Sequence, residues 1–211
     1  MRHVRNLFPL WLCSVSLFAQ YKADPVAAPP LELAANIAAL MQSSGFRITN
    51  EGAPYCEIWF RESRPSGQNS SQPNVTLPMV PFGALLGVIR FNGTGIDRRG
   101  QSLKAGVYTL RYGILPMNGI HEGAAPQRDF LLLTPAAEDK DPNARPSFDA
   151  LVVMSKKASL TPHPAVLSFW KADADSPGFS QQGDDWILQT KLGDTPIAVI
   201  LAGTASSQSQ Q

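Results

Sequence analysis

The sequence has little cysteine, little charge and only one long apolar run, and each shortage narrows the class of protein that it can encode. It holds two cysteines, and Cys13 lies inside the apolar run near the N-terminus. Only Cys56 remains beyond that run, so no disulfide can form within the rest of the chain. Charged residues make up 17% of the chain, against about 25% in a typical globular protein.

The apolar run is typical of a secretory signal peptide, which we predict at residues 1–20. A short basic stretch, MRHVRN, precedes the apolar LFPLWLCSVSLFA, and Ala19 is a small residue near the expected cleavage point. The run is shorter than the roughly 20 residues of a membrane-spanning helix, and no second one follows. We therefore expect an exported protein, periplasmic or extracellular, with no membrane span.

The charge balance argues against polyanionic partners. Loss of Arg2 and Arg5 with the leader takes the 18 basic residues to 16, against 17 acidic ones. A nearly neutral chain without basic clusters is a poor match for nucleic acid or for an anionic membrane surface.

The common catalytic motifs are also missing. The chain has no Gly-x-Ser-x-Gly, no phosphate-binding Gly-x-x-x-x-Gly-Lys and no His-Glu-x-x-His. We therefore expect no cofactor, and no enzyme class is indicated by motif.

The remaining pattern predicts a mainly β fold. Proline and glycine, 18 and 16 residues, favour turns, and short runs of alternating or continuous apolar residues predict strands. Helical spacing occurs only at residues 30–45 and 147–159. We predict about eight strands, at residues 46–49, 55–61, 85–91, 106–113, 129–135, 165–172, 185–192 and 195–203. Strands without regular helices between them favour an antiparallel β-sandwich, or a jelly-roll-like barrel, with an N-terminal helix and one inserted helix.

The predicted organisation is a single domain. Residues 21–29 read as a flexible leader, residues 30–203 as the β-sandwich domain and residues 204–211 as a disordered tail.

A long predicted loop, residues 114–128, is the first candidate site. Connections of this length are often functional, and this one holds His121 and Glu122 and ends at Arg128 and Asp129. His163, between two prolines, is the other histidine beyond the leader. If the fold brings the two loops together, His121, His163 and a nearby carboxylate have the chemistry of a transition-metal site. The alternative is that His121 meets only solvent and His163 makes a local hydrogen bond.

Three arginine-containing segments offer further candidates. Arg111 lies on the strand before the loop, and Arg128 and Asp129 lie where the chain enters the next strand, so an arginine–carboxylate bridge is expected there. Such a bridge is either a structural clamp or part of an anion site. Arg98 and Arg99 follow Asp97 in a turn, and they either steer an anionic ligand or form a solvated local ion pair.

Aromatic side chains on the strands suggest a sugar-binding face as a minor alternative. Tyr55, Trp59, Tyr108 and Tyr112 are the residues concerned. Alternating aromatics also occur as ordinary core or sheet packing, and exposed coplanar rings would decide between the two.

Residues 99–142 carry a resemblance to a family. The skeleton is Arg-Gly-Gln, then Ala-Gly-Val-Tyr-Thr-Leu-Arg-Tyr, a His-x-Gly loop and Arg-Asp-Phe-Leu-Leu. With the CEIWFR, HPAV and LSF segments, it resembles an uncharacterised family of secreted proteins of environmental bacteria. The resemblance implies a signal peptide and a β-rich exported domain, and it implies no activity.

These observations favour a non-enzymatic exported domain that binds a small ligand, a glycan or a protein partner. The binding residues would come from His121, Glu122, Arg128, Asp129, His163 and Arg111. The competing hypotheses are a metal-dependent enzyme or metal-binding protein built on His121 and His163, and a purely structural envelope protein.

Overall fold

The computed structural model describes residues 20–117, 127–173 and 177–205, in which twelve strands and two helices are present. The N-terminal half holds β1 (Tyr21–Val26), α1 (Ala35–Ala38), β2 (Gly45–Asn50), β3 (Ala53–Phe60), β4 (Leu85–Phe91), β5 (Gly95–Ile96) and β6 (Ser102–Leu103). The C-terminal half holds β7 (Gly106–Ile114), β8 (Asp129–Pro135), α2 (Phe148–Ser159), β9 (Val166–Lys171), β10 (Gly178–Gln182), β11 (Asp185–Leu192) and β12 (Thr195–Ala202).

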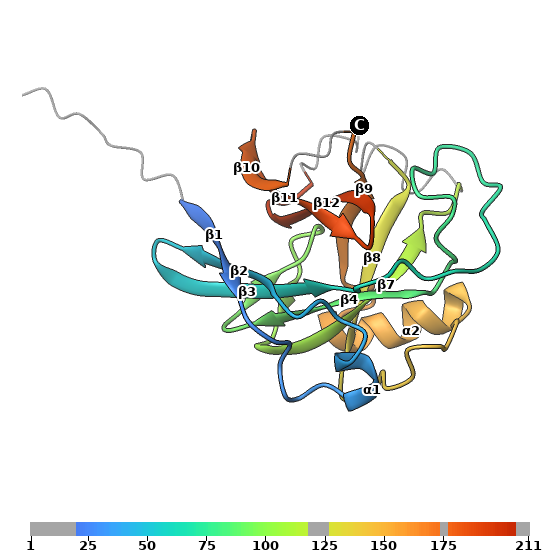
Figure 1. Cartoon of the computed structure of the whole chain (residues 1–211), viewed down its shortest axis with the longest axis horizontal. Helices are drawn as coiled ribbons and strands as arrows, with labels where there is room; N and C mark the ends of the chain where they lie inside the picture. The colour runs from blue at the N-terminus through green and yellow to red at the C-terminus, as the bar shows by residue number, and fades with distance from the viewer. Residues whose placement is uncertain (1–19, 118–126, 174–176, 206–211) are drawn as a thin grey trace, which may run out of the picture.

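Ten strands form one antiparallel sheet in the order β1-β2-β3-β4-β7-β8-β9-β12-β11-β10, and β5 and β6 form a separate small hairpin. The prediction of a mainly antiparallel β fold is confirmed. The strands belong to a single sheet that curls over itself (Figure 1). Register shifts at β2–β3, β4–β7 and β11–β12 help the sheet to bend, since bulges kink a strand and raise its twist.

The main core fills the concave side of this sheet. Side chains of β7 and β8 point alternately to the two faces of the sheet, and Leu110, Tyr112, Leu131 and Leu133 point into this core. Their neighbours Arg111, Phe130 and Leu132 lie on the opposite, convex face, where Phe130 and Leu132 form a smaller cluster with Leu151 of α2.

The two free edges of the sheet approach each other and nearly close it. The Tyr21 ring of β1 lies 5.5 Å from the Trp186 ring of β11, and Trp186 stacks on Phe179 of β10. A groove of about 560 Å³ lies along this seam, bordered by β1, β2, β10 and β11. The edge strand β1 contains Pro25, which lacks an N–H, and this limits pairing with another chain.

Two segments differ from prediction. Residues 21–26 are strand β1 and not a flexible leader, because Tyr21 and Ala23 alternate inward onto the core while Pro25 is tolerated at an edge. The helix expected at 30–45 is reduced to α1 at 35–38, which has no side-chain N-cap. Leu33, Ile37 and Met41 are nevertheless buried together over Trp59.

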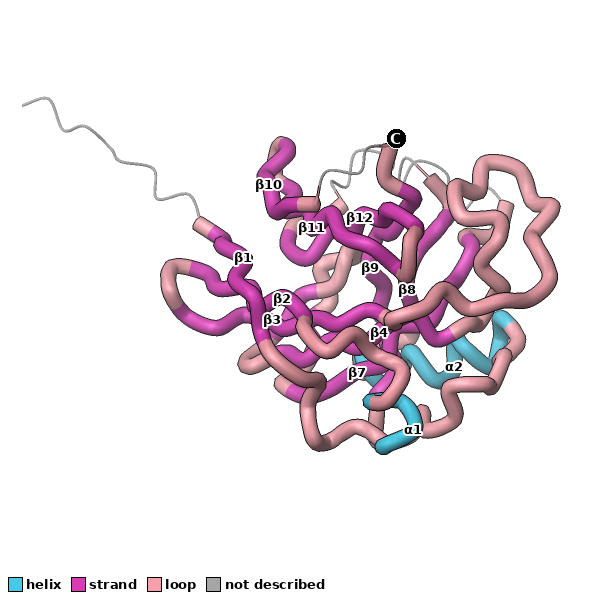
Figure 2. The backbone as a smooth tube through the Cα atoms, viewed as in Figure 1, coloured by secondary structure: helices cyan, strands magenta, loops and turns pink. Residues whose placement is uncertain are grey.

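Loops, drawn pink in Figure 2, connect the strands of the curled sheet. The longest described connection, residues 61–84, joins β3 to β4 and is fastened to β8 through hydrogen bonds from the Thr76 and Leu77 amides to Asp129. In the described part of the chain, no helix has the length and apolar character needed to cross a membrane.

Candidate ligand-binding pocket

Helix α2 is the element that builds the candidate site. Ser147 caps its start by accepting a hydrogen bond from the Ala150 amide, and Leu160 ends it in a left-handed conformation with φ 56°. Leu151, Ser155, Ala158 and Ser159 are buried toward the sheet, and the small side chains among them let the helix approach closely.

A second stripe of α2 borders a pocket against the convex face of β8 and β9. Phe148, Val152 and Lys156 follow one another at four-residue spacing, so they share a side of the helix. The pocket has a volume of about 240 Å³. Its remaining walls are Leu115, Pro116, Phe130, Leu132, Pro162, Pro164 and Val166.

Positive charge gathers on this otherwise apolar pocket. Arg99, Lys156 and His163 are its ionisable lining residues, and no described lining residue is acidic. Lys156 comes from α2, Arg99 from the turn after β5, and His163 from the loop between α2 and β9. Basic side chains over apolar walls provide the two kinds of contact that an amphipathic anion requires.

The turn that carries Arg99 is held by the buried carboxylate of Asp97. Its oxygens accept hydrogen bonds from the Arg99 amide at 2.9 Å, from the Gln101 amide and side chain at 2.8 Å each, and from the Val166 amide at 3.1 Å. The Arg98 amide also donates to the Val166 carbonyl at 2.8 Å. The turn is therefore fixed to the first residue of β9.

The loop that carries His163 is fixed to the same turn. Gln101 donates to the Pro164 carbonyl at 3.0 Å, and its side-chain oxygen accepts from the Thr161 hydroxyl. Ser159 donates to the His163 carbonyl at 2.5 Å. A hydrogen-bond network thus joins two sides of the pocket mouth.

In each of two pairs of consecutive basic residues, one residue forms an ion pair and the other lines the pocket. Arg98 pairs with Asp185 while Arg99 faces the pocket, and Lys157 pairs with Glu138 while Lys156 faces the pocket. Within the residues that the structure describes, no ion pair includes Arg99 or Lys156.

The predicted site residues are only partly brought together. His163 lines the pocket, exposed to solvent, whereas His121 and Glu122 lie outside the described residues. The proposed meeting of the two histidines therefore stays a prediction. Asp129 is engaged elsewhere, by the Tyr112 hydroxyl and two backbone amides. Among the described residues no group of three or more His, Cys, Asp or Glu is placed to hold a metal.

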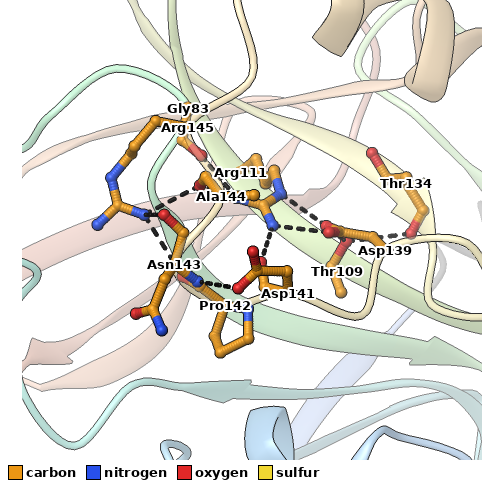
Figure 3. Close-up of polar contacts among 10 residues, drawn as sticks. All are labelled: Gly83, Thr109, Arg111, Thr134, Asp139, Asp141, Pro142, Asn143, Ala144 and Arg145. Atoms are coloured by element: carbon orange, nitrogen blue, oxygen red, sulfur yellow. Dashed lines mark hydrogen bonds and ion pairs between the residues drawn. The ribbon is translucent and has the colours of Figure 1, made fainter.

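Arg111 is fully buried, and its carboxylate partner is Asp139 (Figure 3) and not Asp129. It forms a bidentate pair with Asp139, at 2.6 Å for both hydrogen bonds, and donates to the carbonyls of Gly83, Ala144 and Asp141 at 2.8–2.9 Å. These contacts use all five guanidinium N–H groups, so none is left for a ligand. The expected bridge is wrong because Arg111 and Asp129 point to opposite faces of the sheet.

The same network influences Arg145, whose guanidinium donates to the Ala144 carbonyl at 3.0 Å. Partial burial and the nearby positive charge of Arg111 lower the pKa of Arg145 below its usual range. Arg111 holds residues 139–144 against the sheet, immediately before α2 begins, and Arg145 adds hydrogen bonds within that segment.

Arg128 and Asp129, where the chain enters β8, fasten this part of the chain to other segments. Arg128 donates to the Leu115 carbonyl at 2.8 Å and to the Pro73 carbonyl at 2.9 Å, so it fixes a pocket wall residue to the 61–84 loop. Asp129 is buried and accepts from the Tyr112 hydroxyl at 2.6 Å. Burial and this hydrogen bond raise the pKa of Tyr112 above its usual range.

The aromatic strand residues do not form a sugar-stacking face. Trp59, Tyr108 and Tyr112 are buried, and Tyr55 packs against the core with its ring nearly perpendicular to that of Phe91. Cys56 is fully buried, and burial raises the pKa of its thiol above the usual range.

Sequence reasoning missed the part that α2 plays. Phe148, Val152 and Lys156 are not among the candidate residues that the sequence suggested. The signal was present, since residues 148, 152 and 156 form an apolar-to-basic stripe distinct from the buried stripe 151, 155 and 158.

Comparisons with family models, curated proteins and solved structures gave no match for this chain. The resemblance to secreted bacterial proteins therefore stays a prediction.

Proposed function

We propose that the protein is an exported, non-enzymatic domain that binds a small ligand in the pocket between α2 and the convex face of the sheet. The observation that carries the proposal is an apolar cavity of about 240 Å³ whose mouth is already organised by hydrogen bonds. This volume lies slightly below the roughly 300–1,000 Å³ of sites for drug-sized molecules, so a smaller ligand fits best.

The residues that line the pocket support ligand binding in preference to catalysis. None of the described lining residues is Ser, Cys, Asp or Glu, so none of them offers His163 a hydroxyl or thiol nucleophile or an orienting carboxylate. Nucleophilic catalysis requires a nucleophile within hydrogen-bond reach of a base. The apolar walls instead supply transfer free energy to any ligand that fits them.

A titration followed by protein-observed NMR tests the proposal. The probes are 3-phenylpropionate and its neutral amide, 3-phenylpropanamide, which share an apolar body. We expect saturable shifts of residues around the pocket with at least one of them. The absence of saturable shifts with either probe at millimolar concentration would reject the pocket as a ligand site and favour a purely structural role.

A filled-pocket variant gives the matched control. Val152→Trp places a large ring in the pocket from the half-buried side of α2, and we expect it to abolish binding. Val153→Trp introduces the same ring one residue later, where the side chain is 59% exposed, and binding should persist. Equal loss in both variants would mean that the shifts come from elsewhere.

Export is proposed from residues 1–20. Expression of the full chain in a bacterial host should give an exported product whose mass corresponds to cleavage close to Ala19–Tyr21. An intact chain retained in the cytoplasm would contradict this part of the proposal.

A further inference from the structure

We infer that the ligand of the α2 pocket is a small organic anion, with one carboxylate on an apolar body. The inference rests on the proposed function and specifies the class of ligand. It is carried by the placement of Arg99 and Lys156 at one pocket, together with the absence of acidic groups from its described lining.

The first argument is the contrast between neighbouring cations. Arg98 and Lys157 each have a carboxylate partner, Asp185 and Glu138, whereas no ion pair of the described residues includes Arg99 or Lys156. Two cations that approach one small cavity without counter-charge repel each other, and an anion between them relieves that repulsion.

The second argument is that the charges stand beside apolar walls. Phe130 and Leu132 are almost fully buried at the floor, and Leu115, Val152 and Val166 pack against them. Water is a poorer competitor for a charged head that lies next to such walls, because the local dielectric is lower. A neutral apolar molecule would use the walls alone and leave both cations unpaired.

The third argument is preorganisation. The backbone of Arg99 is fixed through Asp97, which accepts four hydrogen bonds and is fully buried. Lys156 stands on a capped helix. Binding therefore requires ordering of the two side chains but not of the backbone that carries them, which lowers the entropic cost of holding an anion.

Comparison of 3-phenylpropionate with 3-phenylpropanamide tests the inference directly. We expect the acid to bind about tenfold more tightly than the amide, as for one well-formed charge-assisted contact. Added salt should weaken binding of the acid and leave the amide unchanged. Equal affinities would overturn the anionic assignment while leaving the proposed function intact, and no binding of either would reject both.

Substitutions test whether Arg99 and Lys156 are the residues that contact the carboxylate of the acid. Arg99→Ala and Lys156→Ala should each weaken binding of the acid by roughly three- to tenfold and leave the amide within about twofold. Lys157→Ala is the matched control, because it removes the adjacent charge that pairs with Glu138, and it should leave both affinities unchanged. An equal effect of Lys156→Ala and Lys157→Ala would show a diffuse surface potential and overturn the assignment. Native chemical-shift spectra of each variant confirm that the fold is retained.

Discussion

Arg111 joins β7 to three separate loop positions through the carbonyls of Gly83, Asp141 and Ala144, in addition to its pair with Asp139. A buried charge is tolerated only when its hydrogen bonds are complete, and here they are. The loop that Arg111 holds leads directly into Ser147 and Phe148, so this residue positions a wall of the pocket without touching it.

Arg111→Lys should destabilise the protein by about 3 kcal/mol, since an ammonium group has three donors for partners arranged around a five-donor fork. The free energy of unfolding from urea titrations measures the change. Arg145→Lys is the control, because Arg145 is exposed and donates to nearby carbonyls of its own loop, and it should cost no more than about 0.5 kcal/mol. A smaller loss for Arg111→Lys than for Arg145→Lys would contradict the role assigned to Arg111.

Asp97 has the corresponding role at the pocket mouth. In Asp97→Asn one acceptor oxygen becomes an NH₂ group, which faces the Gln101 side-chain and Val166 N–H donors in place of accepting from them. We expect a loss of about 1–3 kcal/mol in stability and weaker binding of 3-phenylpropionate, because the turn carrying Arg99 loosens. Binding that is unchanged in a folded Asp97→Asn protein would show that the turn does not position Arg99.

Single residues also mark the limit of prediction from sequence. Arg111, Arg128 and Asp129 were selected because their residue types form specific polar contacts, and all three do. Their partners were not predictable, since Asp139 and Gln72 lie in irregular segments that only the tertiary fold brings close. Strict alternation would place Tyr55 on the face opposite Cys56, but the register shift in β2–β3 leaves it as an extra residue that packs against the same core.

At the scale of elements, α2 shows how one helix serves two surfaces. Its buried stripe packs on the sheet, where the Ser155 hydroxyl donates to the Ala165 carbonyl at 2.9 Å and accepts from the Ala165 amide at 3.0 Å. The adjacent stripe is left to line the pocket. The contacts that pack α2 on the sheet therefore also determine the shape of the pocket.

The end of α2 contains an unfavourable residue. Leu160 is left-handed, a conformation that glycine adopts without the steric cost of a Cβ, and its side chain is 64% exposed. Leu160→Gly should raise the free energy of unfolding by about 0.5–1 kcal/mol, measured by thermal or urea unfolding. Val153→Gly, within the same helix at an exposed position, should instead lower stability, and a loss in both variants would contradict this account of the helix end.

Elements with continuous apolar or alternating patterns were predictable, and those with weak local signals were not. β4 and β8 have the predicted bounds, and β7 and β11 differ by at most one residue. β1 and β10 were missed because they are edge strands with polar outer residues and, in β1, a proline. The helix predicted at 30–45 is longer than α1. Its apolar residues recur every fourth position because they are buried over Trp59, and some of them lie in turns outside α1.

At the scale of the whole molecule, one curled sheet encloses most of the core, and the aromatic contact between Tyr21 and Trp186 joins its two edges. Sequence patterns predicted the strands and left open whether they form a sandwich or a barrel, since that choice depends on bulges and long-range pairing. The pocket lies outside this closed core, on the convex face. Ligand binding there need not open the core.

The enclosed core should make the protein sensitive to alkali. Burial raises the pKa values of Cys56, Tyr55 and Tyr112 above their usual ranges, so the native state holds protons that the unfolded chain releases above about pH 8.5 for the thiol and about pH 10 for the phenols. Stability from these groups is complete below those values and falls as pH rises, by up to about 1.4 kcal/mol per pH unit for each group.

Urea unfolding across the alkaline range measures this dependence, and Cys56→Ala separates the contributions. The variant should be less stable at neutral pH, because it removes a buried side chain, but its decline should begin near the phenol range at about pH 10 and not near the thiol range. The native thiol should also react with a thiol reagent only as fast as the protein unfolds, since Cys56 is fully buried. A wild-type stability that stays level through the thiol range would contradict the burial of a protonated Cys56 within the closed core.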